Sequence, residues 1–227
     1  MIERPGVRVW DELAAGYEAW FEAPLGAFVI DEQVAALRRI LPQEGPETVV
    51  EIGAGTGHIA RMLRSWGFRV TAVEPSQPMR EEGMRLSPGS GIQWFEAVAE
   101  DLPFEDHAFD GALFFASLEF IADPAAAFRE ARRVVKPGGW IVAGILDARS
   151  PWANLYRAEA ERGNAPWTAA RFFDPSEIQQ VAGWEAEATE GAVYLAPTAD
   201  PPFDHADRLA KDAGGHPSLT LLRWRTP

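Results

Sequence analysis

Three glycines at alternate positions follow a short apolar segment in the first quarter of the chain. The segment 48–52 is rich in β-branched residues, and the glycines are Gly53, Gly55 and Gly57. Glycine lets the backbone turn sharply and lets a ligand approach where a Cβ atom would clash. A strand that runs into spaced glycines and then into a helix is typical of a nucleotide-type binding turn.

The sequence of this loop differs from two known phosphate-binding motifs, the dinucleotide fingerprint and the P-loop. In a dinucleotide fingerprint, Gly-x-Gly-x-x-Gly, the sixth position is glycine, but counted from Gly53 it is His58, and Gly57 comes one residue early. No Gly-Lys-Ser/Thr follows, which excludes a P-loop. A nicotinamide-dependent oxidoreductase therefore stays only as the weaker alternative.

A carboxylate, Glu74, stands at the end of the next predicted strand, seventeen residues after Gly57. A carboxylate there can accept hydrogen bonds from both hydroxyls of a ribose lying across the strand ends. The glycine loop, its strand and helix, and Glu74 together predict a cofactor site.

The elements that must position these residues alternate between strand and helix patterns. Predicted strands cover 48–52, 68–73, 92–98, 109–115 and 140–146, with helices near 59–66, 77–86 and 124–135 and a turn at 136–139. Such alternation favours βαβ units, a parallel sheet and right-handed crossovers.

The flanking segments do not show this alternation of strands and helices. Residues 10–41 predict two helices separated at Pro24 and Gly26, and residues 150–180 predict an irregular helical segment. Two final strands are expected within 185–195 and 219–225, around a Pro-, Asp- and Gly-rich segment with a short helical piece near 208–211.

Five short motifs follow one another between residues 45 and 150. In chain order they are Glu51-x-Gly53-x-Gly55-x-Gly57, Ala72-Val73-Glu74-Pro75-Ser76, Ala99-Glu100-Asp101-Leu102-Pro103-Phe104, Phe109-Asp110 and Val134-Val135-Lys136-Pro137-Gly138-Gly139. In these motifs the chain resembles the class I S-adenosylmethionine-dependent methyltransferases, and most nearly the small-molecule branch that includes the ubiquinone and menaquinone methyltransferases. The resemblance is loose outside this region.

The resemblance implies an α/β, Rossmann-like fold. Its seven-stranded, mostly parallel sheet would end in an antiparallel hairpin and carry helices on both faces and a helical lid. The implied cofactor is S-adenosyl-L-methionine, with S-adenosyl-L-homocysteine as its product. The implied cofactor-binding residues are Tyr17, Glu51, Gly53, Ala54, Gly55, Gly57, Glu74, Pro75, Ser76, Met79, Ala99, Glu100, Asp101 and Phe115.

The same resemblance also implies which part of the cofactor each residue contacts. It puts the glycines under the methionine and ribose, Glu51 near the methionine end, Glu74 at the ribose hydroxyls, Ser76 and Met79 beside the adenine, and Ala99 and Glu100 at the adenine edge. Many relatives carry Asp two residues before Glu100, where it takes the adenine amino group, but this chain has Val98. Adenine recognition must then rest on backbone groups or on Glu100.

Methyl transfer from a sulfonium needs placement and exclusion of water more than it needs acid or base. The four histidines, His58, His107, His205 and His216, have no spacing that suggests a metal site, so none is expected. His58 is expected to be solvated at a helix start.

Residues facing the methyl acceptor are harder to predict. Glu119 is the favoured acceptor contact or catalytic base, and its alternative interpretation is an exposed carboxylate at a helix start. The other candidates are Tyr17, Trp20, Phe21, Phe28, Ser117, Asp147, Trp152 and Tyr156, several of which could simply pack in the lid.

Composition narrows the function further. The chain has 21 Lys and Arg against 34 Asp and Glu, a net charge of −13, which disfavours nucleic acid and anionic lipid surfaces and suits a cationic sulfonium. It contains no cysteine, which excludes thiol nucleophiles and disulfides, and no apolar run of membrane-spanning length. We expect a cytoplasmic protein, a monomer or a homodimer.

The sequence therefore predicts a single methyltransferase domain over 1–227, which acts on a small-molecule acceptor. Its core would comprise about 46–150, 181–195 and 218–227, and its lid about 1–45, 150–180 and 196–217. A noncatalytic S-adenosylmethionine-binding module is the main alternative. Protein methylation also stays open, although no peptide groove is evident from the sequence.

Overall fold

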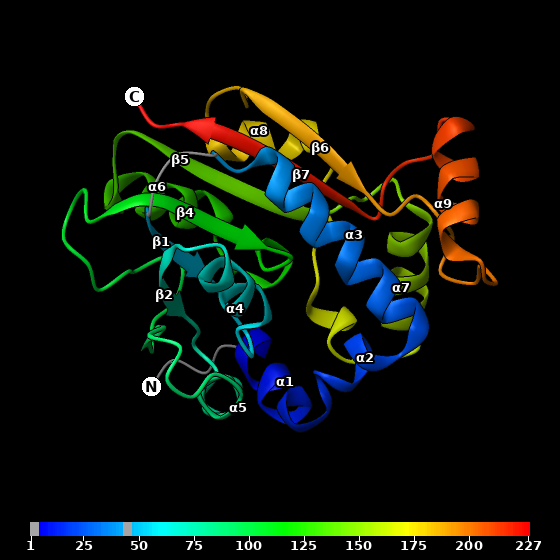
Figure 1. The fold of residues 1–227 in the computed structure, drawn as a ribbon, viewed down its shortest axis with the longest axis horizontal. Coiled ribbons are helices and arrows are strands. Elements are labelled where there is room, and N and C mark those ends of the chain that lie inside the picture. The colour runs from blue at the N-terminus through cyan, green and yellow to red at the C-terminus, as the bar shows by residue number, and fades with distance from the viewer. Residues whose placement is uncertain (1–4, 43–46) are drawn as a thin grey trace.

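A seven-stranded sheet forms the centre of the protein, whose computed structural model describes residues 5–42 and 47–227 (Figure 1). The strand order is β3-β2-β1-β4-β5-β7-β6. The strands are β1 Thr48–Ile52, β2 Arg69–Val73, β3 Gln93–Phe95, β4 Phe109–Phe115, β5 Val135–Leu146, β6 Ala188–Ala192 and β7 Leu219–Arg225. The first five pair in parallel, and β7 is antiparallel to both β5 and β6. This is the predicted Rossmann-like architecture.

The register brings the carboxyl ends of the central strands to one edge. Ile52 of β1 pairs with Val73 of β2 on one side and with Phe114 of β4 on the other. The chain connects β1 to β2 on one side and reaches β4 on the other, so β1 lies where the strand order reverses. Open α/β sheets bind ligands at such a point, outside the carboxyl ends of the strands.

Helices cover both faces of the sheet. One apolar cluster joins the sheet to α3 (Pro24–Ile40) and α4 (His58–Ser65), and a second joins it to α6 (Pro124–Val134) and α8 (Pro175–Ala182). Helix α5 (Gln77–Leu86) follows β2, as predicted. The central strands are buried on both sides, which explains their continuous apolar sequences.

The amino-terminal segment differs from the predicted pair of helices. It contains α1 (Pro5–Leu13), a 3₁₀ turn at Ala14–Gly16, α2 (Ala19–Glu22) and then α3. Pro24 occupies the first turn of α3, but Gly26 lies inside that helix, so the prediction of a break at glycine was wrong. Further along, β3 is shorter than expected, and the predicted turn at 136–139 lies within β5, beside a shift in the β4–β5 register.

The segment between β5 and β7 contains α7 (Pro151–Glu161), a 3₁₀ turn at Trp167–Ala169, α8, β6 and α9 (Phe203–Asp212). Helix α8 packs against α6, and its Ile178 is fully buried. Residues 175–180 therefore lie in a core layer, and the expected lid boundary at 180 moves back to the start of α8. Helix α9 is longer than the short helical piece that was expected near 208–211.

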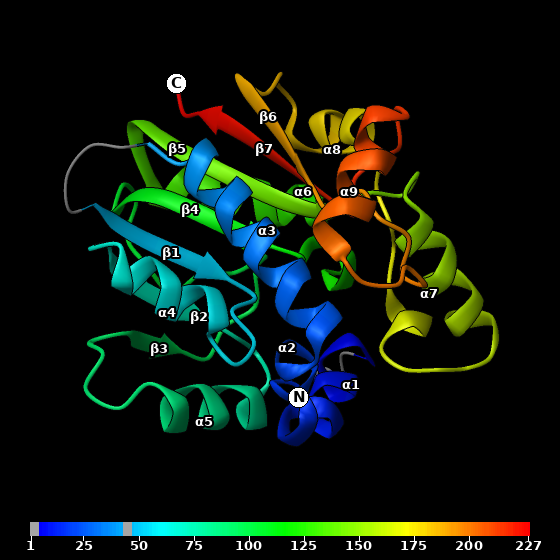
Figure 2. The ribbon, with the colours of Figure 1, turned by 45° about the vertical axis from the view of Figure 1, so that its right-hand side comes forward.

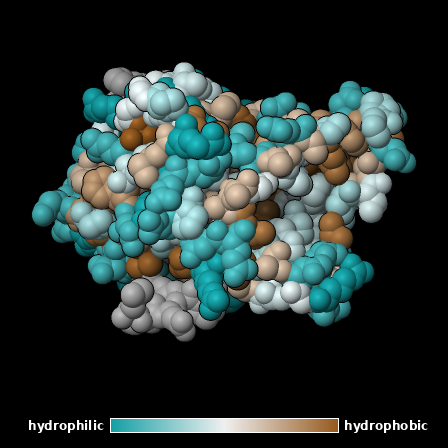
Figure 3. All heavy atoms as spheres, turned by 90° about the horizontal axis from the view of Figure 1, so that it is seen from below, coloured by the Kyte–Doolittle hydropathy of each residue, from teal (hydrophilic) through white to brown (hydrophobic). Residues whose placement is uncertain are grey.

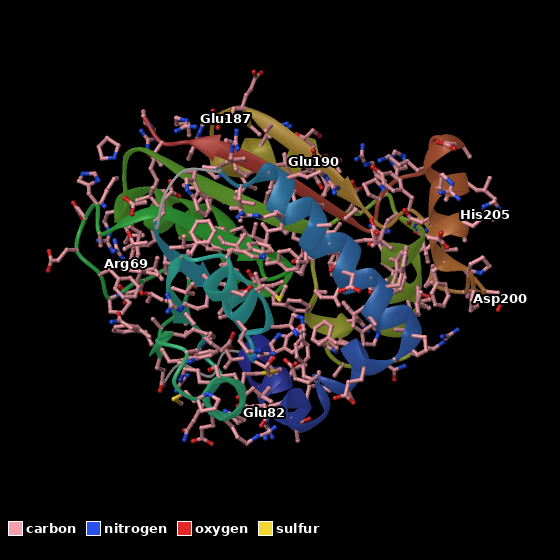
Figure 4. The ribbon with its side chains drawn as sticks, viewed as in Figure 1. Arg69, Glu82, Glu187, Glu190, Asp200 and His205 are labelled. Atoms are coloured by element: carbon pink, nitrogen blue, oxygen red, sulfur yellow. The ribbon has the colours of Figure 1, made fainter. Side chains whose placement is uncertain are left out.

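Figures 1 and 2 place α1, α2, α7 and α9 beyond the carboxyl ends of β1 and β4. Glu187 and Glu190 lie just before and within β6, an edge strand of the sheet (Figure 4). Glu187 pairs with Arg223 at 2.8 Å, and Glu190 pairs with Arg39 at 3.4 Å. Within the part of the chain that the structure describes, no helix is both long enough and apolar enough to cross a bilayer.

Candidate functional site

All three glycines of the loop after β1 have a left-handed backbone conformation, with φ of +77° at Gly53, +55° at Gly55 and +72° at Gly57. A Cβ on Gly53 would lie 2.6 Å from Cβ of Ser117, and one on Gly57 would lie 2.7 Å from the Trp94 ring. A Cβ on Gly55 would meet no atom within 4 Å. Gly53 and Gly57 thus allow close packing, whereas Gly55 leaves open space that a ligand can enter.

Glu74 ties this loop to the loop after β2. Its Oε2 accepts the Gly55 N–H at 2.8 Å, and its Oε1 accepts the Ser76 N–H at 2.9 Å. Burial raises the pKa of Glu74, and these two hydrogen bonds offset part of that rise. A carboxylate can accept further donors on its remaining lone pairs, so these backbone bonds leave Glu74 able to receive hydroxyl groups.

Glu51 is a buried carboxyl, 2% exposed, near the end of β1. Its Oε2 has no hydrogen-bond partner among the described residues. Burial, and after it the negative charge of Glu74, raise the pKa of Glu51 to about 8. Buried polar atoms are almost always partnered, so an unpartnered carboxyl oxygen marks a position for a ligand that donates hydrogen bonds.

Tyr17 reaches the same region from the segment between α1 and α2. Burial and the negative charges of Glu18, Glu74 and Glu51 raise its pKa to about 12. At neutral pH Tyr17 stays protonated and can donate a hydrogen bond.

Sequence reasoning missed Glu18, whose carboxylate contacts the glycine loop and α4. It accepts hydrogen bonds from the Thr56 hydroxyl and, at 3.0 Å, from Arg61. Nδ1 of His58 lies 3.4 Å from Glu18, and the Phe21 ring lies 4.4 Å from the His58 ring, centroid to centroid. The expectation that His58 is merely solvated was therefore wrong. Glu18 and His58 are forty positions apart, and no local pattern signals such a pair.

Ser76 caps the amino end of α5, because its side chain accepts the Met79 N–H at 3.3 Å. Its hydroxyl also donates to Oδ1 of Asp11 on α1 at 2.6 Å. Met79 is fully buried, and Pro75 connects Glu74 to this cap. The structure thus brings the β2–α5 loop to the amino-terminal segment.

The predicted adenine-edge residues lie on the loop after β3. Ala99 is buried, and Oε1 of Glu100 accepts the N–H of Asp123, the N-cap of α6, at 3.2 Å. Asp101 is exposed, and its N–H donates to the Val98 carbonyl at 3.2 Å. These contacts lead toward α6 or stay within the loop, so they do not join these residues to the glycine loop.

Glu119 is buried, 1% exposed, in the 3₁₀ turn Leu118–Phe120 that follows β4. Its Oε1 accepts the Leu146 N–H at 2.6 Å, and its Oε2 has no partner among the described residues. Burial raises the pKa of Glu119 to about 7. The alternative interpretation of Glu119 as an exposed helix-start carboxylate was therefore wrong.

Aromatic rings gather beside this carboxyl edge. The Trp10 ring lies 4.8 Å from Phe120, and Phe120 lies 6.4 Å from Trp167, which stacks on Tyr156 at 3.7 Å. Burial and the charge of Tyr17 raise the pKa of Tyr156, so the two phenols lie near one another. Figure 3 looks onto the amino-terminal helices and shows a hollow bordered by apolar residues. We call Trp10, Tyr17, Phe120, Tyr156 and Trp167 the aromatic wall.

Several other predicted acceptor residues have structural contacts instead. Ser117 donates to the Ile52 carbonyl at 2.8 Å, Trp152 donates to the Leu195 carbonyl at 2.8 Å, and Asp147 binds Arg149. The remaining acceptor candidates include Phe21 at His58, Phe28 packed on Phe203 and exposed Trp20. Phe115, a predicted cofactor residue, is part-buried at the end of β4.

No three His, Cys, Asp or Glu side chains are grouped to hold a metal within residues 5–42 and 47–227. His205 lies on α9, far from α5 (Figure 4).

Comparison with known proteins supports the same interpretation of this edge. Residues 50–143 match the family described as "Methyltransferase domain". Over this region the chain resembles the class I S-adenosylmethionine-dependent methyltransferases. A crystal structure from Thermotoga maritima, described as an SAM-dependent methyltransferase, possible histamine N-methyltransferase, superposes on this chain with a TM-score of 0.79 and 25% identity, covering 98% of this chain and 100% of that one.

Two sequence relatives of the chain extend this result. An uncharacterized protein of Mycobacterium tuberculosis is 36% identical over 168 residues, which are 74% of this chain and 56% of that protein. This chain therefore spans little more than half of that relative. A ubiquinone/menaquinone biosynthesis C-methyltransferase of Desulfotalea psychrophila is 32% identical over 152 residues, 62% of this chain and 61% of that protein. The predicted resemblance to quinone methyltransferases is confirmed.

The residues present suit the methyltransferase cofactor. S-adenosylmethionine carries an ammonium group, ribose hydroxyls and a sulfonium. The unpartnered oxygen of Glu51 suits the ammonium, the free lone pairs of Glu74 suit the hydroxyls, and the open space at Gly55 leaves room for the chain that joins them.

Proposed function

We propose that the protein transfers a methyl group from S-adenosylmethionine to a small-molecule acceptor by in-line displacement. The observation that carries the proposal is the unpartnered buried carboxyl of Glu51, which lies near the end of β1, two positions before the first glycine of the loop. When bound, the cofactor supplies an activated methyl group. The protein has to bind and orient the cofactor and the acceptor and to exclude water, and its aromatic and buried carboxyl groups allow this.

In this proposal Glu51 holds the methionine ammonium, Glu74 holds the ribose hydroxyls, and Tyr17 donates to the methionine end. The residues assigned to the remaining cofactor contacts are Gly53, Ala54, Gly55, Gly57, Pro75, Ser76, Met79, Ala99, Glu100, Asp101 and Phe115. Since Gly55 leaves open space where the others pack, its loop forms the floor of the site.

The acceptor we propose is a neutral or cationic small molecule with a planar ring. The aromatic wall supplies flat apolar surfaces, and the buried carboxyls of Glu51, Glu74 and Glu119 lie at the same edge of the sheet. Such a set repels anions and favours neutral or positively charged compounds. The relatives named for quinone biosynthesis and for histamine point the same way, because both compounds contain a planar ring.

Glu119 is proposed as the acceptor contact or general base. Its pKa of about 7 leaves the carboxyl partly ionised at neutral pH, and its unpartnered Oε2 can take a hydrogen bond or a proton from the acceptor. Replacing it with glutamine should leave cofactor binding intact and lower methyl transfer.

Titration calorimetry with S-adenosylhomocysteine tests the cofactor site. Gly55→Val should weaken binding by about a hundredfold or more, because the new side chain fills the space for the ligand, and Glu74→Ala should weaken it by about tenfold or more. Gly89→Val is the matched control, since Gly89 also has a positive φ, +70°, with no atom near its missing Cβ. It should strain the fold without affecting binding.

Failure of the wild-type protein to bind S-adenosylhomocysteine would refute the proposal, as would unchanged affinity in both site variants. Incubation with methyl-labelled cofactor and a panel of ring-containing amines, phenols and quinols then distinguishes an enzyme from a noncatalytic binding module. Label transferred to a small acceptor supports the enzyme.

A further inference from the structure

One carboxylate, that of Glu18, fastens the amino-terminal segment to the glycine loop. It accepts hydrogen bonds from the Thr56 hydroxyl and, at 3.0 Å, from the Arg61 guanidinium. Arg61 also donates to the Thr56 carbonyl at 2.7 Å. Thr56 is fully buried and lies between Gly55 and Gly57, so Glu18 is bonded directly to the loop that forms the proposed floor of the cofactor site.

A second contact fastens the same segment to the other loop of the site. The Ser76 hydroxyl donates to Asp11 at 2.6 Å, and Ser76 follows Glu74 by two positions. Glu74 itself bonds to Gly55 and Ser76, so the two anchored loops are joined to one another. The segment 11–22, which we call the clasp, therefore spans the site from one loop to the other.

Packing holds the second half of the clasp only in part. Phe21 packs against the core, but no side chain of α2 is fully buried, and Trp20 is 42% exposed. The side chains of Glu18 and Arg61 are only 23% and 24% exposed, and hydrogen bonds between charged groups are stronger than those between neutral ones. Burial would raise the pKa of Glu18, but the bonds from His58, Thr56 and Arg61 outweigh it and lower the pKa to about 2. Glu18 thus stays ionised and bonded across the physiological range.

Tyr17 lies in sequence between the two anchors, Asp11 and Glu18. Its neighbour in sequence is Glu18, and its ring packs against Trp10 at 5.9 Å and Phe21 at 5.5 Å. The charges of Glu51 and Glu74 act on its hydroxyl, as shown above. Where Glu18 is bonded to Thr56, its neighbour Tyr17 is therefore held beside the glycine loop.

We propose that Glu18 is a positioning residue that holds Tyr17 over the bound cofactor, and that the clasp opens when the cofactor enters or leaves. The inference rests on the proposed function, because it assigns a role to a segment that covers the proposed site. Segments with few buried side chains open at low free-energy cost, so losing the Glu18 contacts should leave the clasp open for much longer.

Stopped-flow and calorimetric measurements with S-adenosylhomocysteine test this role. Glu18→Ala should speed dissociation by about tenfold or more while association changes by less than about threefold. The unfolding midpoint without ligand should shift by no more than about 3 °C, because Glu18 contacts Thr56, His58 and Arg61 but no side chain of the apolar core. Glu22→Ala is the matched control, since Glu22 is an exposed glutamate on α2 and should leave both rate constants unchanged.

Hydrogen exchange of the wild-type protein gives a second, independent measurement. Amides of residues 11–22 should exchange more slowly when S-adenosylhomocysteine saturates the site. Equal exchange with and without ligand would refute the proposed role of the clasp. A wild-type dissociation rate in Glu18→Ala would refute it as well. If that variant does not fold, the exchange comparison decides alone. Absence of binding by the wild-type protein would instead refute the proposed function.

Discussion

At the scale of single residues, the site contains buried carboxyl groups whose pKa values are raised. Glu51 is buried without a partner for Oε2 and beside Glu74, and these two causes raise its pKa to about 8. In the ligand-free protein at neutral pH it is therefore mainly protonated. A bound ammonium group favours the ionised carboxylate, so binding must lower the pKa of Glu51 and release its proton.

The first prediction concerns this proton. Near pH 7, binding of S-adenosylhomocysteine should release about one proton, and affinity should rise with pH by up to about tenfold per unit until it levels off near pH 8. The sign follows because the free protein holds the proton and the complex does not. Calorimetry in two buffers of different ionisation enthalpy measures the release. Glu51→Gln should bind S-adenosylhomocysteine more weakly, and it should abolish both the proton release and the pH dependence of the affinity. If the pH dependence persists in that variant, another group titrates.

At the scale of elements, the sequence predicts the strands better than the amino-terminal helices. Strands β4 and β7 have the expected bounds, because both are short segments with aromatic residues, which favour strands. Gly26 shows why the helices were harder. A Cβ there would lie 1.9 Å from the Trp20 carbonyl oxygen, so this glycine allows close packing of α2 on α3 and does not end a helix.

The candidate site was predictable to the extent that it is local in sequence. Gly55 and Glu74 lie in recognisable motifs at strand ends, and the structure joins them by a hydrogen bond of 2.8 Å. The contacts of Glu18 with Thr56 and His58 arise only when the amino-terminal segment folds back onto α4. The burial of Glu119 likewise depends on Leu146 of a neighbouring strand, which no local pattern shows.

The second prediction tests the place of α8 in the core layer. Asp174 caps this helix by accepting the N–H groups of Ser176 at 2.7 Å and Glu177 at 3.0 Å. Asp174→Ala should lower the free energy of unfolding by about 1 kcal/mol, because those donors lose their acceptor. Urea unfolding measures the change, with the exposed Glu185→Ala as control. S-adenosylhomocysteine affinity should stay unchanged, since α8 packs on α6; weaker binding at unchanged stability would place α8 at the site instead.

At the scale of the whole molecule, charge distinguishes the two forms of the cofactor. The protein has a net charge of −13, and among the acidic residues in that count Glu51 and Glu74 lie at the proposed site itself. S-adenosylmethionine has one positive charge more than S-adenosylhomocysteine, the sulfonium. The field of the protein therefore attracts the methyl donor more strongly than the product, which helps exchange after each turnover.

The third prediction follows from screening of that field. Raising the ionic strength from about 0.02 M to about 0.5 M shortens the Debye length from roughly 20 Å to about 4 Å, so distant acidic residues no longer act on the ligand. The dissociation constant for S-adenosylmethionine should rise by about threefold, and that for S-adenosylhomocysteine by much less. Calorimetry with both ligands in the same salt series measures the difference, and the product is the matched control because it lacks only the methyl group and the charge. Equal salt dependence would mean that only short-range contacts discriminate the two. In that case the preference for the donor would depend on Glu51, Glu74 and the aromatic wall, and the acidic surface would have no part in it.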